Sequence, residues 1–327
     1  MTAQTQRRRL VVDTDPGVDD AVALLYLVDQ PEVEIVAVGT VHGNVPSATG
    51  ADNALRILEA AGLPHVPVAV GANLPLNQEE LLTGQFIHGE NGLSGHTGPA
   101  PQGRPVAESA AEQLVRLARQ HPGELSVLAL GPLTNIALAL LLEPRLPELV
   151  GEVVWMGGAI DVPGNVTAHA DANTWHDAEA AELVLAAGFA LTVVPLDVTA
   201  HAWVGSDWLD ALANHSGPRA QFAHQVLAQY VHVYSQLMGG ARGERGCLLH
   251  DPVAAVILLE PSLARYEEHQ VVVELAGTRT RGATLVDRRG FHTPADPADA
   301  RKPVRVAVAA DMPAVLTRIQ HALMPSA

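Results

Sequence analysis

The chain has 327 residues, a formal net charge of −16, one cysteine and 4% aromatic residues. Its 48% hydrophobic and 17% charged residues are typical of a globular protein, and the length fits one large α/β domain over residues 1–327. The acidic balance and the scarcity of aromatic residues argue against a nucleic-acid partner, and Cys247 has no second cysteine for an intrachain disulfide.

Apolar strands alternate with helical patterns along most of the chain. We expect strands at 10–13, 34–41, 125–130, 152–156 and 190–196, and helices at 21–28, 51–61, 134–142 and 178–187. Further helices are expected across 206–237, ending at Gly239 and Gly240, and strand-like runs at 271–274, 283–287 and 304–308 indicate a small C-terminal antiparallel extension. This order predicts an α/β fold with a mainly parallel, Rossmann-like open sheet and helices on both faces. Ligands of such sheets bind beyond the carboxyl ends of the strands.

The N-terminal segment does not have the pattern of a targeting signal. Arg7, Arg8 and Arg9 precede only three apolar residues before Asp13, which is too short for the core of a signal peptide. No uninterrupted apolar run approaches the roughly 18 residues of a membrane helix. We therefore expect a cytoplasmic protein without a membrane partner.

Residues 83–105 interrupt the alternation of strands and helices. The segment is rich in glycine and proline and carries His88, Glu90, Asn91 and His96. A long segment without regular structure inside a compact domain is typical of an active-site lid or of a disordered stretch. We expect a functional lid here.

Four carboxylates lie within eight residues directly after the first expected strand, at Asp13, Asp15, Asp19 and Asp20. Alternation along the strand places Asp13 and Asp15 on one side, and the other two enter the first turn of a helix, where they complement its dipole. The dipole accounts for two carboxylates but not for four within eight residues. Like charges about 5 Å apart repel by roughly 3 kcal/mol at an effective dielectric near 20, so several such pairs are costly unless a cation lies among them or some carboxylates are protonated. Oxygen ligands without a nearby cysteine favour Ca²⁺ or Mg²⁺. The cluster therefore predicts a metal site.

One family with a strand that ends in Asp-x-Asp is the haloacid-dehalogenase-like phosphotransferases. Their chemistry needs a downstream lysine to balance the phosphoryl charge. The only lysine of this chain is Lys302, near the C-terminal end, and Pro16 departs from that family's usual continuation. The sequence therefore disfavours phosphoryl transfer.

Several motifs in order resemble the nucleoside hydrolase family of the inosine–uridine-preferring type. The residues that carry the resemblance are Asp13-Thr14-Asp15-Pro16-Gly17-Val18-Asp19-Asp20-Ala21, Thr40-Val41-His42-Gly43-Asn44, Leu130-Gly131-Pro132-Leu133-Thr134-Asn135, Met156-Gly157-Gly158, Gly164-Asn165-Val166-Thr167, Asp171-Ala172-Asn173 and His250-Asp251-Pro252. The resemblance implies hydrolysis of the N-glycosidic bond of ribonucleosides to ribose and a free purine or pyrimidine base. It also implies a homodimer or homotetramer.

The same resemblance implies a ligand set for the metal. Ca²⁺ would be held by Asp15, Asp20, Asp251 and the backbone carbonyl of Leu130, with a water and two ribose hydroxyls completing its shell. Asp15 would accept a proton from the Ca²⁺-bound water.

Ribose contacts are implied at Asp19 and Asn173, with Asn44 nearby and with Asn165 and Asp171 towards the 5′ side. Buried polar groups of this kind predict a preference for ribose over deoxyribose, because an analogue without the hydroxyl leaves them unpaired. Asp171 and the following alanine depart from the Glu and Phe that are usual in the family. The departures bear on substrate preference more than on the reaction.

The base side of the site is less determined by the sequence. His250 is favoured as the acid that protonates the departing base, and His88 on the expected lid either competes for that role or contacts the base. Tyr230 and Tyr234, one helical turn apart, either line the base pocket or pack their helix. Met156 fits a core position as well as a nucleoside contact.

Three polar residues have simpler structural interpretations. Asp13 is expected to orient the metal ligands and not to bind the metal itself. Asn135 and Asp177 are each expected to cap a helix. A second possible function is a nucleoside- or ribose-binding protein without turnover, but Asp15 favours an enzyme, because binding alone needs no base beside a water.

Overall fold

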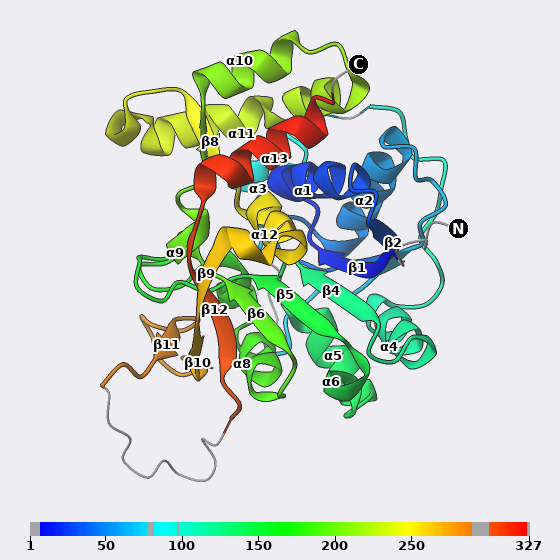
Figure 1. Cartoon of the computed structure of the whole chain (residues 1–327), viewed down its shortest axis with the longest axis vertical. Helices are drawn as coiled ribbons and strands as arrows, with labels where there is room; N and C mark the ends of the chain where they lie inside the picture. The colour runs from blue at the N-terminus through cyan, green and yellow to red at the C-terminus, as the bar shows by residue number, and fades with distance from the viewer. Residues whose placement is uncertain (1–6, 78–81, 97, 290–300, 326–327) are drawn as a thin grey trace.

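The computed structural model describes residues 7–77, 82–96, 98–289 and 301–325. Its centre is an eight-stranded sheet with the strand order β3-β2-β1-β4-β5-β6-β12-β9 (Figure 1). The strands are β1 (Arg8–Thr14), β2 (Val33–Thr40), β3 (Val68–Val70), β4 (Leu125–Ala129), β5 (Glu152–Met156), β6 (Leu191–Val194), β9 (Ala264–His269) and β12 (Val304–Ala310). β9 is antiparallel to β12, and the other neighbouring pairs of this sheet are parallel.

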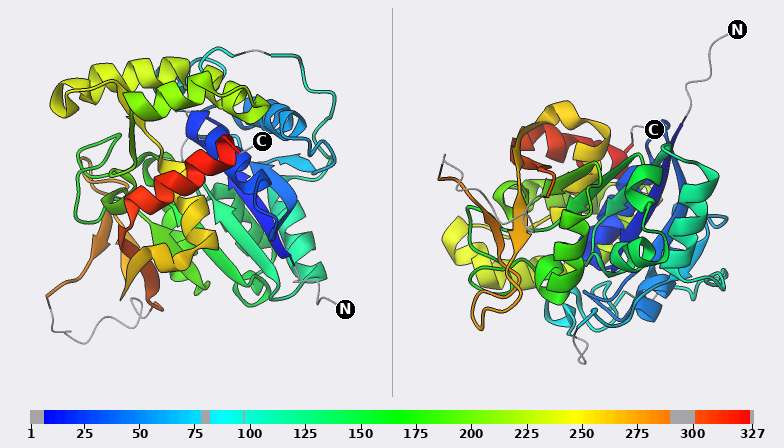
Figure 2. Two further views of the ribbon diagram at one scale, coloured as in Figure 1. Left: turned by 45° about the horizontal axis from the view of Figure 1, so that its top comes forward. Right: turned by 90° about the horizontal axis from the view of Figure 1, so that it is seen from below.

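Helices cover both faces of the sheet (Figures 1 and 2). One face carries α1 (Val18–Val28), α2 (Ser47–Ala60), α12 (His250–Leu259) and α13 (Met312–Leu323), and the other carries α4 (Ala110–Gln120), α5 (Thr134–Leu142) and α8 (Ala178–Ala186). The central strands are buried on both faces, as all five residues of β4 are, which is why they form continuous apolar runs in the sequence. The predicted α/β fold is confirmed.

The strand order reverses between β1 and β4. The chain continues from β1 to β2 and β3 on one side, whereas β4, β5 and β6 extend the sheet on the other side. A crevice forms at such a reversal, at the carboxyl ends of the two strands. Asp15 directly follows Thr14 at the end of β1, and Leu130 directly follows Ala129 at the end of β4. The topology therefore brings two motifs that are far apart in sequence to one place.

The remaining elements are two small sheets and several further helices. Two antiparallel pairs form separate small sheets, β7 (Trp203–Gly205) with β8 (Gly246–Leu248) and β10 (Val271–Val273) with β11 (Thr284–Val286). The other helices are α3 (Gln85–His88), α6 (Leu146–Leu149), α7 (Ala172–His176), α9 (Leu196–Thr199), α10 (Ser206–Asn214), α11 (Pro218–Arg242) and the 3₁₀ turn η1 (Pro261–Leu263). Within the described ranges, no helix combines the length and the apolar character needed to cross a membrane.

The end of one predicted helix and the pairing of one predicted strand differ from the structure. α11 continues through Gly239 and Gly240 to Arg242, and the chain turns at Gly243, which has a positive φ of 73°. A positive φ is the conformation that commonly ends a helix at glycine. In the C-terminal extension, β12 joins the main sheet parallel to β6, so the antiparallel strand of that sheet is β9, which was not predicted.

Candidate active site

The turn from β1 to α1 fixes the carboxylate of Asp20. Its Oδ2 accepts hydrogen bonds from the Gly17 backbone N–H at 2.9 Å and from Asn44 Nδ2 at 3.0 Å, and its Oδ1 accepts one from the Thr14 hydroxyl. The bond from Gly17 also satisfies a free N–H at the start of α1. Asp20 therefore lies in the first turn of α1, as predicted, and is buried beside other acids.

Asp15 is 2% exposed and has one oxygen without a hydrogen-bond partner. Oδ2 accepts the Asn44 backbone N–H at 2.6 Å, whereas Oδ1 is unpaired. Two motif glycines clear the space around it: a Cβ on Gly43 would lie 2.0 Å from Oδ2, and one on Gly131 would lie 2.8 Å from Oδ1. An unpaired buried carboxylate oxygen is costly unless a ligand satisfies it.

Asp19, Asp20 and Asp251 form the acidic cluster, in which ligand oxygens lie within 4.8 Å of one another. Asp251 comes from the first turn of α12, which packs against α1. Burial raises the pKa of Asp251 and of Asp15 well above the usual range, and repulsion from neighbouring aspartates adds to it. Burial likewise raises the pKa of Asp19 to about 7.

The residues at this position fit a hard divalent cation. The three carboxylates of the cluster are buried, and Asp15, which lies outside this trio but close enough to be repelled by Asp19 and Asp20, has an unpaired buried oxygen. Such oxygens are the preferred ligands of Ca²⁺ and Mg²⁺. The Leu130 carbonyl accepts Asn173 Nδ2 at 2.7 Å and retains a second lone pair. A cation would offset the repulsion that otherwise burdens these buried charges.

The ribose-side residues divide into two groups in the structure. Asn173 Nδ2 donates to the carbonyls of Leu130 and of Met156, the latter at 2.9 Å, which leaves its Oδ1 as an acceptor. Asp171 is 1% exposed and caps α7, accepting the Asn173 N–H at 3.0 Å. Asn165 is exposed and accepts the backbone N–H of Ala172 at 2.9 Å. The structure thus brings Asn173 to Leu130, whereas Asp171 and Asn165 hold the turn before α7. Met156 is buried in the core beside Asn173.

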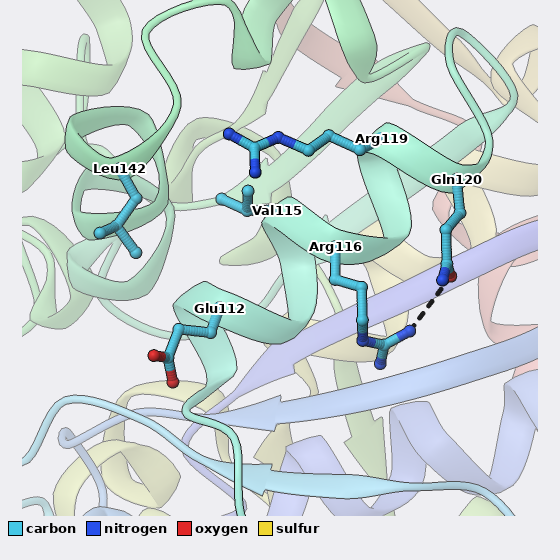
Figure 3. Close-up of a pocket in the computed structure, with 6 residues that line it drawn as sticks. All are labelled: Glu112, Val115, Arg116, Arg119, Gln120 and Leu142. Atoms are coloured by element: carbon cyan, nitrogen blue, oxygen red, sulfur yellow. Dashed lines mark hydrogen bonds between the residues drawn. The ribbon is translucent and has the colours of Figure 1, made fainter.

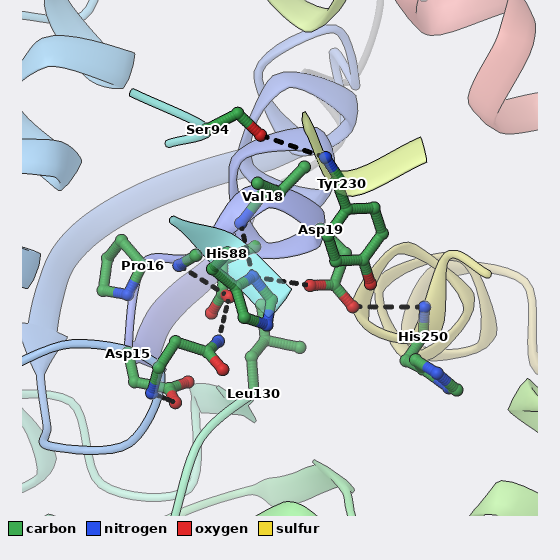
Figure 4. A network of polar contacts seen from close by, with 12 residues as sticks. Asp15, Pro16, Val18, Asp19, His88, Ser94, Leu130, Tyr230 and His250 are labelled. Carbon is green, nitrogen blue, oxygen red and sulfur yellow. Dashed lines mark hydrogen bonds and ion pairs between the residues drawn. The ribbon is translucent and has the colours of Figure 1, made fainter. Parts of the chain in front are cut away.

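The segment expected to be a lid brings His88 to the acidic cluster (Figure 4). His88 Nδ1 accepts the backbone N–H of Val18 at 3.1 Å and lies 4.0 Å from Asp19 Oδ1. A Cβ on Gly17 would lie 2.5 Å from this nitrogen, so the glycine permits the approach. Burial lowers the pKa of His88 to about 3, which makes the ring neutral.

His250 is held by one partner at each ring nitrogen. Nδ1 lies 2.9 Å from Thr199 Oγ1 and Nε2 lies 3.3 Å from the Tyr234 hydroxyl, while the backbone N–H donates to Asp19 Oδ2 at 3.3 Å. Burial lowers the pKa of His250 to about 4. Tyr230 and Tyr234 of α11 pack with ring centroids 4.7 Å apart. Tyr230 also lies 5.2 Å from the His88 ring, so both histidines share one aromatic wall.

Some residues near the site were misassigned or missed by sequence reasoning. The prediction that Asn135 caps a helix is wrong: its Nδ2 donates to Asp13 Oδ1 at 2.7 Å, and the cap position of α5 is Leu133. The prediction for Asp177 is confirmed, because it accepts the Ala180 N–H at 3.0 Å and caps α8. Thr199 was missed. No local pattern marks it, since its partner His250 is 51 residues away.

A surface pocket of about 450 Å³ lies on the opposite face of the sheet, between α4 and α5 (Figure 3). Its lining residues are Glu112, Val115, Arg116, Arg119, Gln120 and Leu142. The two arginines pair with Glu108 and Glu143. The pocket is therefore separate from the acidic cluster.

Buried carboxylates, an orienting amide and two histidines lie at the topological switch point of an open α/β sheet. Such a site is that of an enzyme that binds a small ligand together with a cation. A family model described as inosine-uridine preferring nucleoside hydrolase matches residues 10–317. The chain is 38% identical to "Probable uridine nucleosidase 2" of Arabidopsis thaliana, over 98% of each chain.

Two solved structures are similar over almost the whole chain. One is the plant nucleoside hydrolase PpNRh1, with a TM-score of 0.91 and 31% identity over 98% of this chain and 99% of that one. The other is a purine-preferring ribonucleoside hydrolase from Gardnerella vaginalis, with a TM-score of 0.88 and 30% identity over 97% and 98%. The chain belongs to the inosine-uridine preferring nucleoside hydrolase family, and it is a ribonucleoside hydrolase.

Proposed function

We propose that the protein hydrolyses ribonucleosides with Ca²⁺ held by Asp15, Asp20, Asp251 and the Leu130 carbonyl, and with Asp15 as the general base. The observation that supports this most is the unpaired, buried Oδ1 of Asp15 beside the acidic cluster. When bound, Ca²⁺ supplies a Lewis acid that lowers the pKa of a neighbouring water molecule.

The fixed orientation of Asp15 suits proton transfer. The Asn44 N–H holds Oδ2 at 2.6 Å, so Oδ1 is the oxygen that takes a proton from the attacking water. The water oxygen bonds to the anomeric carbon, the bond from that carbon to the base nitrogen breaks, and its electron pair leaves with the base. Positive charge develops on the ribose during this exchange, and the surrounding carboxylates stabilise it.

The ribose hydroxyls meet two acceptors in this proposal. Asn173 Oδ1 faces away from the carbonyls that bind its Nδ2, and the buried Asp19 carboxylate lies on the side of α12. A sugar that lacks one hydroxyl leaves the acceptor of that hydroxyl without this partner, which carries a desolvation cost. Ribonucleosides are therefore expected to be preferred strongly over deoxynucleosides.

His250, and not His88, is proposed to protonate the leaving base. Val18 donates to His88 Nδ1, so this nitrogen is occupied and cannot take up a proton to replace one that Nε2 gives to the base. His88 is instead assigned to base contact as a hydrogen-bond donor. His250 is linked to the Tyr234 hydroxyl at Nε2, which provides a path for a proton. Tyr230 and Tyr234 would line the base.

We propose uridine as the preferred substrate, because the relative from Arabidopsis with 38% identity is named for it, while the purine-preferring structure shares 30%. A cytoplasmic location and a homodimer or homotetramer, both expected from the sequence, stay predictions. Size-exclusion chromatography with light scattering tests the oligomer.

A reducing-sugar assay on uridine, cytidine, inosine, adenosine and 2′-deoxyuridine tests the proposal, with Asp15→Asn as the matched control. We expect sugar release from uridine that exceeds release from the other nucleosides, stops in chelator and returns with Ca²⁺. The kcat of Asp15→Asn should fall by at least about 100-fold. Release that persists in chelator would remove the role of the cation, and release from Asp15→Asn at the wild-type rate would remove the role of the base. Binding of a nucleoside without any release would identify a binding protein.

A further inference from the structure

The β10–β11 hairpin lies outside the parallel sheet, yet one of its side chains holds the loop that follows β5. The Thr284 hydroxyl accepts the backbone N–H of Ala159 at 2.9 Å and donates to the carbonyl of the same residue at 2.9 Å. Thr284 is 2% exposed and 125 residues away in sequence. Because both backbone groups of Ala159 depend on this one hydroxyl, no aliphatic side chain can replace it.

A second contact joins the same hairpin to α7. Gly282, with a φ of +81°, would place a Cβ 3.1 Å from the Cα of Trp175 and 3.1 Å from the Cβ of Ala170. The adjacent Arg281 forms an ion pair with Glu179 of α8. The hairpin is thus packed directly against the segment that begins α7.

The two contacts converge on one carboxylate. The N–H of Gly158, next to Ala159, donates to Asp171 Oδ1 at 2.7 Å, and Asp171 also accepts the N–H of Asn173 as the cap of α7. Gly158 has a φ of +91°, a conformation that is open to glycine but rare for other residues. Gly158 is bonded at its N–H to Asp171 and at its carbonyl to the Leu196 N–H, and Thr284 fixes the residue that follows it.

We infer that Thr284 is a positioning residue for the ribose side of the site, acting through Ala159, Gly158 and Asp171 on Asn173. This inference rests on the proposed role of Asn173 as a ribose contact. Asn173 Nδ2 reaches the carbonyls of Leu130 and Met156 only while α7 keeps its place. Loss of the Thr284 hydroxyl leaves two buried backbone groups unpaired and loosens α7.

Thr284→Val removes the hydroxyl and keeps the shape of the side chain, whereas Thr284→Ser keeps the hydroxyl. The matched control is Thr192→Val, another buried threonine, whose hydroxyl accepts Arg305 Nε at 2.9 Å away from the site. We expect Thr284→Val to raise KM for the best nucleoside by about fivefold, with kcat changed less than about twofold. Thr284→Ser and Thr192→Val should keep the wild-type KM.

The double variant of Thr284→Val and Asn173→Ala distinguishes a positioning role of Thr284 from a general effect on the structure. In the Asn173→Ala background, Thr284→Val should change kcat/KM less than about twofold, because the two residues act in one chain of contacts. A fivefold effect that persists there, or an unchanged KM for Thr284→Val alone, overturns the inference. If Asn173→Ala itself leaves KM unchanged, the proposed ribose contact fails instead.

Hydrogen exchange gives a readout that does not need activity. Amides of α7 should exchange faster in Thr284→Val than in the wild type, while those of α4 stay unchanged. Equal exchange of α7 in the two proteins overturns the inference. If Thr284→Val does not fold, Gly282→Ala perturbs the same contact from the other side, and the same KM and exchange results are required of it.

Discussion

A variant that lacks one charge of the acidic cluster should be more stable than the wild type when no cation is bound. When a cation is bound, the same variant should be less stable than the wild type. At the 4.8 Å that bounds the separations among Asp19, Asp20 and Asp251, two unit charges repel by about 3.5 kcal/mol at an effective dielectric of about 20. Burial raises the pKa of Asp19 to about 7 and that of Asp251 well above its usual range, so protonation already relieves part of this repulsion near neutral pH. We expect Asp251→Asn in chelator to gain about 2 kcal/mol in free energy of unfolding.

Calcium should reverse the order of the two proteins. The wild type gains about 2.7 kcal/mol when Ca²⁺ is present at 100 times its dissociation constant, whereas Asp251→Asn lacks a ligand and gains less. Urea unfolding followed by tryptophan fluorescence, in chelator and in Ca²⁺, measures both changes. Asp52→Asn, an exposed acid on α2, is the control and should shift neither curve. A variant that is less stable than the wild type in chelator, or that gains as much from Ca²⁺, would refute the reasoning.

Three further predictions concern residues around the cluster. Gly43→Ala places a Cβ 2.0 Å from Asp15 Oδ2, so kcat should fall by at least about 100-fold; an unchanged kcat in steady-state assays would contradict this. Thr14→Val removes the hydrogen bond to Asp20 and should weaken Ca²⁺ binding about tenfold by calorimetry, while Thr14→Ser should not. Burial lowers the pKa of His42 to about 4, below the unfolded value of about 6.5, so its contribution is present above pH 6.5 and is lost as pH falls towards 4. In urea titrations, the free energy of unfolding of His42→Gln should therefore fall by about 3 kcal/mol less over that window than that of the wild type. Equal decreases in the two proteins would show that His42 is not the source of this pH dependence.

The parts of the fold that could be predicted are those whose buried residues form a recognisable pattern in the local sequence. β4 is buried along its whole length and forms one apolar run. β9 (Ala264–His269) is an edge strand with partly exposed and charged residues, so its pattern resembles a loop. The expected helix end at Gly239 and Gly240 was wrong because glycine permits a turn without requiring one, and the positive φ occurs at Gly243.

The candidate site could be predicted where its residues lie in compact motifs, as Asp15, Asp19 and Asp20 do. Partners that meet only through the fold could not be predicted. Asn135 looks like a helix cap because it lies at the start of α5, but its amide binds Asp13, 122 residues away. A sequence pattern shows the residue type and the local element, and the sheet order decides which distant group it meets.

Two helix N-termini explain how four carboxylates can share one buried place. Asp19 and Asp20 lie in the first turn of α1, and Asp251 lies in the first turn of α12. Each helix N-terminus is equivalent to about +0.5 charge, so the pair offsets about one of the four negative charges that include Asp15. A divalent cation offsets two more. About one negative charge then remains beside the ribose, where cleavage of the glycosidic bond develops positive charge. The same cluster that opposes folding without a cation is therefore suited, with one bound, to stabilise the transition state.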